Sequence, residues 1–175
     1  PQVVLAELDG VLAKSEPDPE IQDLLAKSAG LNVALDYLPG ALNWEPPLAP
    51  PPDRELAARI VWFDAFVTNV DRTARNGNML MWHRRLWLID HGAALYFHHA
   101  WTDMDRRAKD PFPLIKEHIL LPFADSLEAA DQSMTATLSQ PVIEQVVNLV
   151  PEEWLNENSR FPTTTEHRQA YIDYL

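Results

Sequence analysis

The chain has 175 residues, of which 46% are hydrophobic and 23% are charged, proportions that are typical of a globular domain and exclude a largely disordered chain. Its net charge of −12 excludes nucleic-acid binding through a broad basic face and argues against docking on an anionic membrane. The absence of Cys excludes disulfides and thiolate catalysis, and we therefore expect a cytoplasmic protein. No apolar run approaches the ~18 residues of a membrane-spanning helix.

The first part of the chain is predicted to contain two strands and one helix. The short, apolar and β-branched run QVVLAELD (2–9) is typical of a strand. Asp18 precedes a proline at the first position of a predicted helix, and Gly30 marks the end of that helix. The loosely alternating run LNVALDYL (31–38) predicts the second strand.

A proline-rich stretch, PGALNWEPPLAPPPD (39–53), indicates a crossing with little regular structure. We therefore divide the chain into two domains, residues 1–45 and 46–175. Asp53 is predicted to cap the helix that follows, RELAARIVWFDAFVTN (54–69). Four apolar residues of this helix follow the helical period and predict the face that packs in the core: Leu56, Ile60, Phe63 and Val67.

Two further expectations concern this helix and the tryptophans. Asp64 is a charged residue on an otherwise apolar helix, and we expect it to pair with an Arg of the loop that follows. Trp62, Trp82 and Trp87 are expected in the core and are not assigned to stacking on a base.

Two apolar runs beyond the loop predict a β-hairpin. They are NMLMW (78–82) and RLWLID (85–90), joined by the polar turn HRR (83–85). The fold class is therefore α+β and mostly helical, with a short hairpin. After Gly92 the sequence predicts short helices separated by Pro, Ser or Thr, at 112–124, 126–138, 140–150, 151–159 and 164–175.

Polar side chains at the two ends of the hairpin region offer a specific chemistry. Asp71 lies in a loop just after a buried helix, where a carboxylate can accept a proton or orient a hydroxyl. Asn76 or Asn78 supplies a neutral oxygen ligand, and Asp90 at a strand end supplies an anionic one. Mg²⁺ favours one or two carboxylates together with substrate phosphates. Because a hairpin brings its two ends to one edge, we expect these residues to converge in a site for phosphoryl transfer.

Simpler structural roles are open for the same residues. An Asp-Arg pair in a loop, as at 71–72, caps turns or forms a surface ion pair, and Asn-Gly at 76–77 is a common turn dipeptide. Asp90 also suits a turn at a strand end. His98 and His99 are adjacent and do not face one ligand together, so a zinc site is not expected.

The string D-R-x-x-x-N, followed by a hairpin and then I-D-H-G, resembles the catalytic and metal loops of the protein-kinase-like superfamily, which includes the phosphatidylinositol 3- and 4-kinases. The strings NVDR (69–72), RNGNML (75–80) and LWLIDHGAALYFHH (86–99) are most similar to the HipA-like kinases. The likeness spans residues 31–99. It implies the hinge and C-terminal lobe of a kinase, in which the hairpin is catalytic.

The resemblance implies a role for each residue of the motif. Asp71 would be the catalytic Asp, and Arg72 would stabilise the loop or the transferring phosphate. Asn76 and Asp90 would bind the metal. In the family the Asn directly precedes the apolar strand, but here two residues intervene, so Asn78 is the alternative metal ligand.

The same resemblance assigns the first domain to nucleotide binding. Residues 1–45 would be a remnant of the N-lobe strands and the hinge, whose backbone at Asp36, Tyr37 and Leu38 would bind ATP. No glycine-rich phosphate loop and no strand Lys paired with a helix Glu occurs in the sequence. We therefore expect the chain to lack most of an N-lobe, to bind ATP poorly and to be inactive or slow by itself.

The predicted function is that of an ATP- and Mg²⁺-dependent phosphotransferase, for which the resemblance suggests a protein Ser or Thr as acceptor. One alternative is a phosphatidylinositol-type lipid kinase, which the net charge of −12 disfavours. Another is a kinase-like module without activity that binds a protein partner. The expected partners are a nucleotide and a protein substrate, with no nucleic acid and no membrane. Apolar surface at the lobe interface also predicts a homodimer of the chain.

Overall fold

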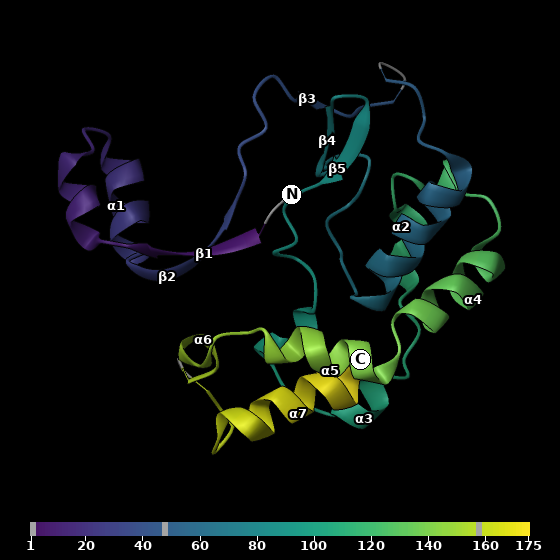
Figure 1. The fold of residues 1–175 in the computed structure, drawn as a ribbon. Helices are drawn as coiled ribbons and strands as arrows, with labels where there is room; N and C mark the ends of the chain where they lie inside the picture. The colour runs from purple at the N-terminus through teal and green to yellow at the C-terminus, as the bar shows by residue number, and fades with distance from the viewer. Residues whose placement is uncertain (1–2, 47–48, 157–158) are drawn as a thin grey trace. The chain divides into compact units, whose positions relative to one another are not determined.

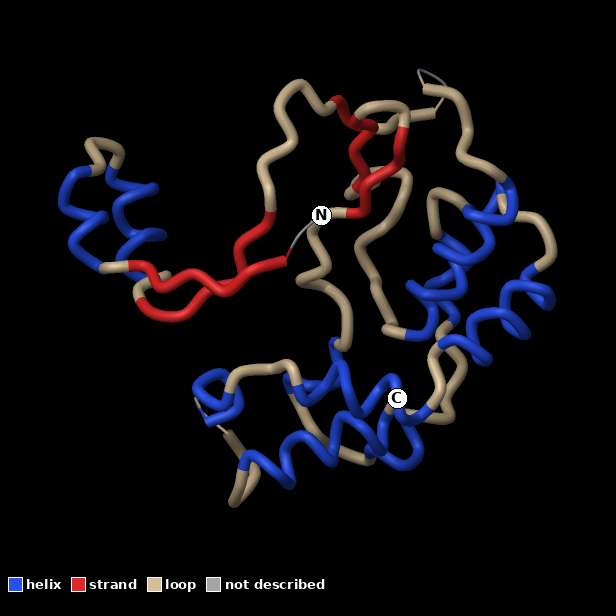
Figure 2. Tube along the Cα trace, in the orientation of Figure 1, coloured by secondary structure: helices blue, strands red, loops and turns tan. Residues whose placement is uncertain are grey.

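The computed structural model describes residues 3–46, 49–156 and 159–175. The fold is α+β, with about 47% helix and small antiparallel sheets, which confirms the predicted class. Figure 2 shows the strands in two separate sheets. The chain divides into two units, Pro1–Pro39 and Gly40–Leu175. This division precedes the predicted boundary after residue 45 because a short strand inside the proline-rich stretch pairs with the larger unit.

The small unit is a two-stranded sheet with one helix. Strand β1 (Val3–Leu8) pairs antiparallel with β2 (Gly30–Leu35), so that the predicted second strand ends three residues early (Figure 1). Helix α1 (Pro19–Lys27) lies between them in the chain, after a 3-10 helix at Gly10–Ser15. As predicted, Asp18 caps α1, because its carboxylate accepts the first free backbone N–H groups of the helix.

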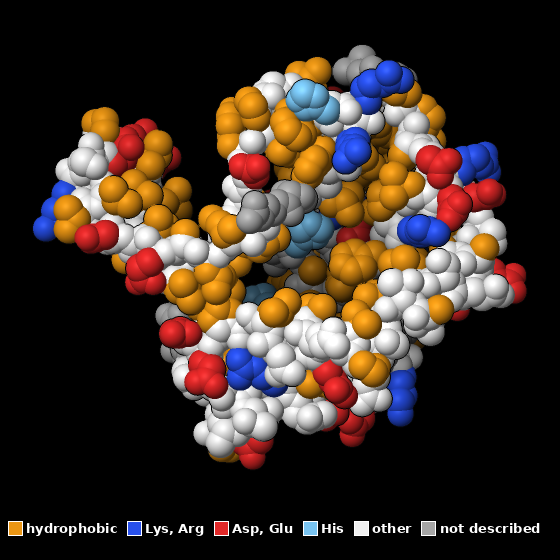
Figure 3. Space-filling model, in the orientation of Figure 1, with side chains coloured by type: hydrophobic (Ala, Val, Ile, Leu, Met, Phe, Trp, Pro, Cys, Tyr) orange, Lys and Arg blue, Asp and Glu red, His pale blue; other side chains and the backbone are white. Residues whose placement is uncertain are grey.

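Apolar side chains cover much of the surface of the small unit. Among its described residues, Ala13 alone is buried, while Leu24 and Val3 are each 63% exposed. Figure 3 shows hydrophobic side chains spread over the face of this unit that the view presents. The small unit therefore has little apolar surface buried among its own elements.

The large unit contains the predicted hairpin. Strands β4 (Met79–Trp82) and β5 (Arg85–Leu88) are antiparallel neighbours. His83 and Arg84 form the turn, both with positive φ, as a two-residue hairpin turn requires. A third strand, β3 (Leu42–Asn43), pairs with β4 and was not predicted, because its proline-rich surroundings indicated irregular structure.

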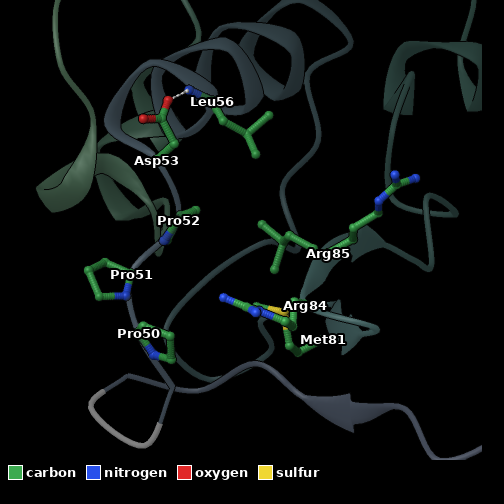
Figure 4. A pocket seen from close by; sticks show the side chains of 9 residues that line it. Pro50, Pro51, Pro52, Asp53, Leu56, Met81, Arg84 and Arg85 are labelled. Carbon is green, nitrogen blue, oxygen red and sulfur yellow. Dashed lines mark hydrogen bonds between the residues drawn. The ribbon is translucent and has the colours of Figure 1, made fainter.

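Helix α2 (Arg54–Phe66) leads from the proline-rich segment to the loop of interest. Its N-terminus is capped by Asp53 as predicted, and Figure 4 shows the bond from the Leu56 N–H. The predicted core face is right in part, because Ile60 and Val67 are buried whereas Leu56 is 43% exposed. The helix also buries Asp64, and the residues three, four and seven positions earlier share that face: Val61, Ile60 and Ala57.

Trp44 is the largest side chain in the core of the large unit, with 1% of its surface exposed. It packs edge-on to Phe123 and donates its indole N–H to the Pro50 carbonyl at 2.9 Å. Its buried neighbours come from α2, β4 and the segment after residue 118: Ala57, Ile60, Val61, Met79, Ile119 and Leu120. The tryptophans predicted for the core are only half-buried: Trp62, Trp82 and Trp87.

Short helices form the C-terminal part, as predicted. The stretch 112–124 is an exception, since it forms two short 3-10 helices around Pro113 and Pro122, which interrupt a longer helix. Helix α4 packs on α2, and α7 packs on α5 and α6 (Figure 1). Within the described ranges, no helix has the length and apolar character needed to cross a bilayer. The helices are α3 (Met104–Arg107), α4 (Leu127–Thr137), α5 (Gln140–Asn148), α6 (Glu152–Asn156) and α7 (Thr164–Tyr174).

Candidate functional site

The loop between α2 and β4 brings three of the predicted site residues together. Asp71 Oδ2 accepts hydrogen bonds from the side-chain amides of Asn76, at 2.8 Å, and Asn78, at 3.1 Å. The Asp71 backbone N–H donates to Asn69 Oδ1 at 3.1 Å. Both the backbone and the carboxylate of Asp71 are therefore held in place.

Local backbone structure explains this convergence. Thr73 and Asn76 exchange two backbone hydrogen bonds, at 2.9 and 3.2 Å, which fold the loop back on itself. Asn78 adopts a left-handed φ of 46°, which Asn tolerates better than most residues. This turn directs its carboxamide toward Asp71.

Asp90 follows the hairpin and lies next to the residue that pairs with the loop. The Ile89 N–H donates to the Asn78 carbonyl at 3.0 Å, so the chain reaches Asp90 one residue after this contact. Asp90 has a φ of 49°, and its Oδ1 accepts from the Gly92 N–H at 3.4 Å. Among the described residues, no hydrogen bond joins its carboxylate to Asp71.

Carboxylate and carboxamide oxygens are the groups that could hold a metal here. Asn76 and Asn78 each use the amide nitrogen to bind Asp71, which leaves the amide oxygen as a ligand atom. In the part of the chain that the structure describes, no three His, Cys, Asp or Glu side chains form a metal-binding group. Oxygen atoms of these kinds are the ligands that Mg²⁺ takes together with substrate phosphates.

Arg72 stabilises the loop from inside. Its side chain is fully buried, and Nε donates to Asp64 Oδ2 at 2.6 Å. Its Nη1 donates to the Asn78 carbonyl. The predicted pairing of Asp64 with a loop Arg is thus present, and the first of the two roles expected for Arg72 fits its geometry, whereas a contact with a transferring phosphate does not.

Asp64 has further partners that the sequence did not indicate. Its Oδ1 accepts from Asn69 Nδ2 at 3.0 Å, and its Oδ2 lies 2.8 Å from His118 Nε2. The Leu120 N–H donates to His118 Nδ1 at 3.0 Å, so Nδ1 carries no proton and Nε2 donates to Asp64. His118 was missed because it lies 54 positions from Asp64, in a stretch that we predicted as a helix.

The buried Asp64 predicts a loss of stability in acid. Burial raises the pKa of Asp64, but hydrogen bonds from His118 and Arg72 outweigh it and hold the pKa below its usual value of 3.8. A lowered pKa contributes stability that is complete above the unfolded value and is lost as the pH falls through the folded one. Urea unfolding should show that the difference in unfolding free energy between the parent and Asp64→Asn shrinks from about pH 6 to about pH 2. A difference independent of pH would contradict this.

The residues predicted to bind ATP lie in the small unit. Asp36, Tyr37 and Leu38 form the irregular segment after β2, and the Tyr37 side chain is 83% exposed. Their backbone groups lie outside the β1–β2 ladder, which ends at Leu35. Asp71, Asn76, Asn78 and Asp90 all belong to the large unit.

The large unit also has a pocket of about 650 Å³ between the proline-rich segment, the start of α2 and the hairpin. Figure 4 shows Arg84 extending from the hairpin toward the proline segment. None of the predicted site residues lines it, so it is distinct from the Asp71 loop. Its lining residues are Pro50, Pro51, Pro52, Asp53, Leu56, Met81, Arg84, Arg85 and Leu86.

A family model described as HipA-like kinase matches residues 1–173. The match covers both units and extends well beyond the residues 31–99 whose motifs carried the resemblance. Searches of curated proteins and of solved structures gave no match to this chain.

Proposed function

Because the chain belongs to the HipA-like kinase family, we propose that it is the catalytic lobe of an ATP- and Mg²⁺-dependent phosphotransferase that acts on a Ser or Thr hydroxyl of a protein. The observation that supports this most strongly is the pair of hydrogen bonds from Asn76 and Asn78 to Asp71. Phosphoryl transfer depends on positioning and electrostatics more than on covalent chemistry. A carboxylate fixed in this way suits that requirement.

Asp71 would act on the acceptor hydroxyl. Among the described residues, only its Oδ2 accepts hydrogen bonds, which leaves Oδ1 to orient the hydroxyl and accept its proton. The backbone bond from the Asp71 N–H to Asn69 restricts the direction of the side chain further. The group is thus held before any substrate arrives, as efficient acid–base catalysis requires.

Asn76 and Asp90 would hold the metal, with Asn78 as the alternative to Asn76. When bound, Mg²⁺ would neutralise charge on the phosphates. Both residues bind Asp71 through the amide nitrogen, but Asn76 is exposed whereas Asn78 is half-buried, which favours Asn76. The nucleotide base would bind the backbone of residues 36–38 in the small unit.

The test is phosphate transfer from γ-labelled ATP with Mg²⁺, in the presence and absence of a cell lysate. We expect labelled protein, and we expect Asp90→Asn to raise the Mg²⁺ concentration for half-maximal transfer at least about tenfold, because even an outer partner of a metal ligand is worth about 10–100-fold in affinity. Asn76→Ala and Asn78→Gly identify the second ligand by the same measurement, since Gly accepts the positive φ at position 78.

Asp105→Asn is the matched control, because Asp105 is exposed on α3, and it should leave the Mg²⁺ dependence unchanged. An unchanged Mg²⁺ dependence in Asp90→Asn would remove Asp90 from the site. If no protein is labelled and ATP does not shift the melting temperature, the enzyme proposal fails and a kinase-like binding module is left. Label on lipid in place of protein would change the proposed acceptor.

A further inference from the structure

The carboxylate of Asp64 joins three parts of the chain in the interior of the large unit. It lies near the end of α2 and is 0% exposed. It accepts hydrogen bonds from Asn69 and Arg72 of the loop and from His118 of the segment that follows α3. Both its oxygens are therefore occupied by partners that are themselves buried.

Two chains of hydrogen bonds run from Asp64 to Asp71. In the first, Asn69 donates to Asp64 and accepts the backbone N–H of Asp71. In the second, Arg72 donates to Asp64 and to the carbonyl of Asn78, and the Asn78 amide donates to the Asp71 carboxylate. Together they close a ring that fixes Asp71 at both its backbone and its side chain.

The segment that contains His118 is attached to the same ring. His118 Nε2 donates to Asp64, and the next residue, Ile119, donates its N–H to the Arg72 carbonyl at 3.1 Å. Thr73 and His118 also form an isolated antiparallel bridge. The loop of Asp71 is thus held between α2 on one side and residues 118–119 on the other.

Stability alone does not account for this arrangement. Taking a carboxylate and a guanidinium out of water costs several kcal/mol per ion. Apolar residues of similar volume can often replace a buried ion pair without loss of folding stability. The Asp64–Arg72 pair is buried beside a loop with several polar site residues. A role in fixing the directions of hydrogen bonds explains why this ion pair lies beside the loop, whereas a role in core packing alone does not.

We propose that Asp64 is a positioning residue, which acts through the ring formed with Asn69, Asp71, Asn78 and Arg72 to hold the catalytic carboxylate in its working orientation. His118 extends this control to the segment after α3. The inference rests on the proposed function, because it treats Asp71 as the catalytic group. Whether the ring of hydrogen bonds forms can be measured without an activity assay.

Amide hydrogen exchange on the unmodified chain tests the ring first. The N–H groups of Asp71 and Ile119 should exchange slowly and at rates similar to those of the buried face of α2, because one cooperative unit protects them. The Arg75 N–H lies in the same loop outside the ring and should exchange rapidly. Exchange of the Asp71 N–H at the rate of Arg75 would overturn the proposal whether or not the protein transfers phosphate.

Asp64→Asn tests the positioning role. The new amide has one oxygen, which faces the donors Arg72 and His118, so its NH₂ group faces the NH₂ group of Asn69. Asn69 must then turn its amide over, and the N–H of Asp71 loses its acceptor. We expect kcat to fall about ten- to hundredfold, as for a catalytic group displaced by about 1 Å, while the KM for ATP stays within about twofold.

A double variant that swaps the two side chains, Asp64→Asn with Asn69→Asp, restores the ring with the donor and acceptor roles of positions 64 and 69 reversed. The amide at position 64 then donates to the carboxylate at position 69, whose second oxygen accepts from the Asp71 N–H. We expect this double variant to recover most of the lost kcat and to return the side-chain N–H resonances of Asn76 and Asn78 to their parent positions. A residue that matters only for stability would lower the melting temperature without this pattern of loss and recovery.

The matched control is Glu55→Gln on the same helix, where an exposed carboxylate pairs with Arg59 at 2.6 Å, and it should change neither kcat nor the resonances. A parent-like kcat in Asp64→Asn would refute the positioning role. So would a double variant that folds but recovers neither kcat nor the resonances. If the parent transfers no phosphate, the proposed function fails, whereas amide exchange and the resonances still decide whether the ring exists.

Discussion

Replacement of Asp71 by Asn is expected to lower the kcat of phosphate transfer by about 10²–10⁴-fold, the usual contribution of a positioned acid or base. The amide oxygen can still accept from Asn76 and Asn78, so the loop should keep its shape. What is lost is the negative oxygen that would accept the hydroxyl proton. The measurement is kcat with saturating ATP, together with the melting temperature, which should stay close to that of the parent.

Asp71→Ala separates the two contributions of this residue. It removes the charge and also the acceptor that holds the amides of Asn76 and Asn78, so it should disturb the loop as well as the chemistry. The side-chain resonances of both Asn residues should therefore move in Asp71→Ala more than in Asp71→Asn. A kcat within about threefold of the parent in Asp71→Asn would exclude Asp71 as the acid–base group.

The candidate site could be predicted where its residues are close in sequence. Asp71, Asn76 and Asn78 share one loop, and the hairpin that places Asp90 after it has a clear apolar pattern. His118 could not be predicted as a partner of Asp64, because no local pattern records the meeting of segments 54 positions apart. Asn69 lies only five positions after Asp64, and its contact was missed although both residues are close in sequence.

The fold shows the same division between local and distant causes. Asp18 and Asp53 cap the helices that their sequences predicted, because a cap needs only its own first turn. The apolar residues of α2 predicted its buried face only in part, because Ile60 and Val67 are buried but Leu56 is exposed and the charged Asp64 is buried. Strand β3 depends on pairing with β4, whose partner residues come 37 and 39 positions later: Asn43 pairs with Leu80 and Leu42 with Met81.

Replacement of Trp44 by Ala is expected to lower the free energy of unfolding by about 3–5 kcal/mol, as for other buried tryptophans. The side chain is 1% exposed and packs against α2, β4 and Phe123. Its indole N–H also ties Pro50 to the sheet. Because whole domains are stable by only about 5–15 kcal/mol, urea unfolding should show a large shift in midpoint.

Two variants separate the sources of this loss. Trp44→Phe keeps a large ring but leaves the Pro50 carbonyl without its donor, so it should cost about 1–3 kcal/mol. Trp62→Ala is the matched control, because Trp62 is half-buried, stacks on Phe66 and donates to the exposed Asp131. It should cost clearly less than Trp44→Ala. Equal losses at the two positions would mean that Trp44 does not anchor the core. Packing of the Trp44 side chain would then not be what stabilises the backbone hydrogen bond from Trp44 to Met79, beside the Asp71 loop.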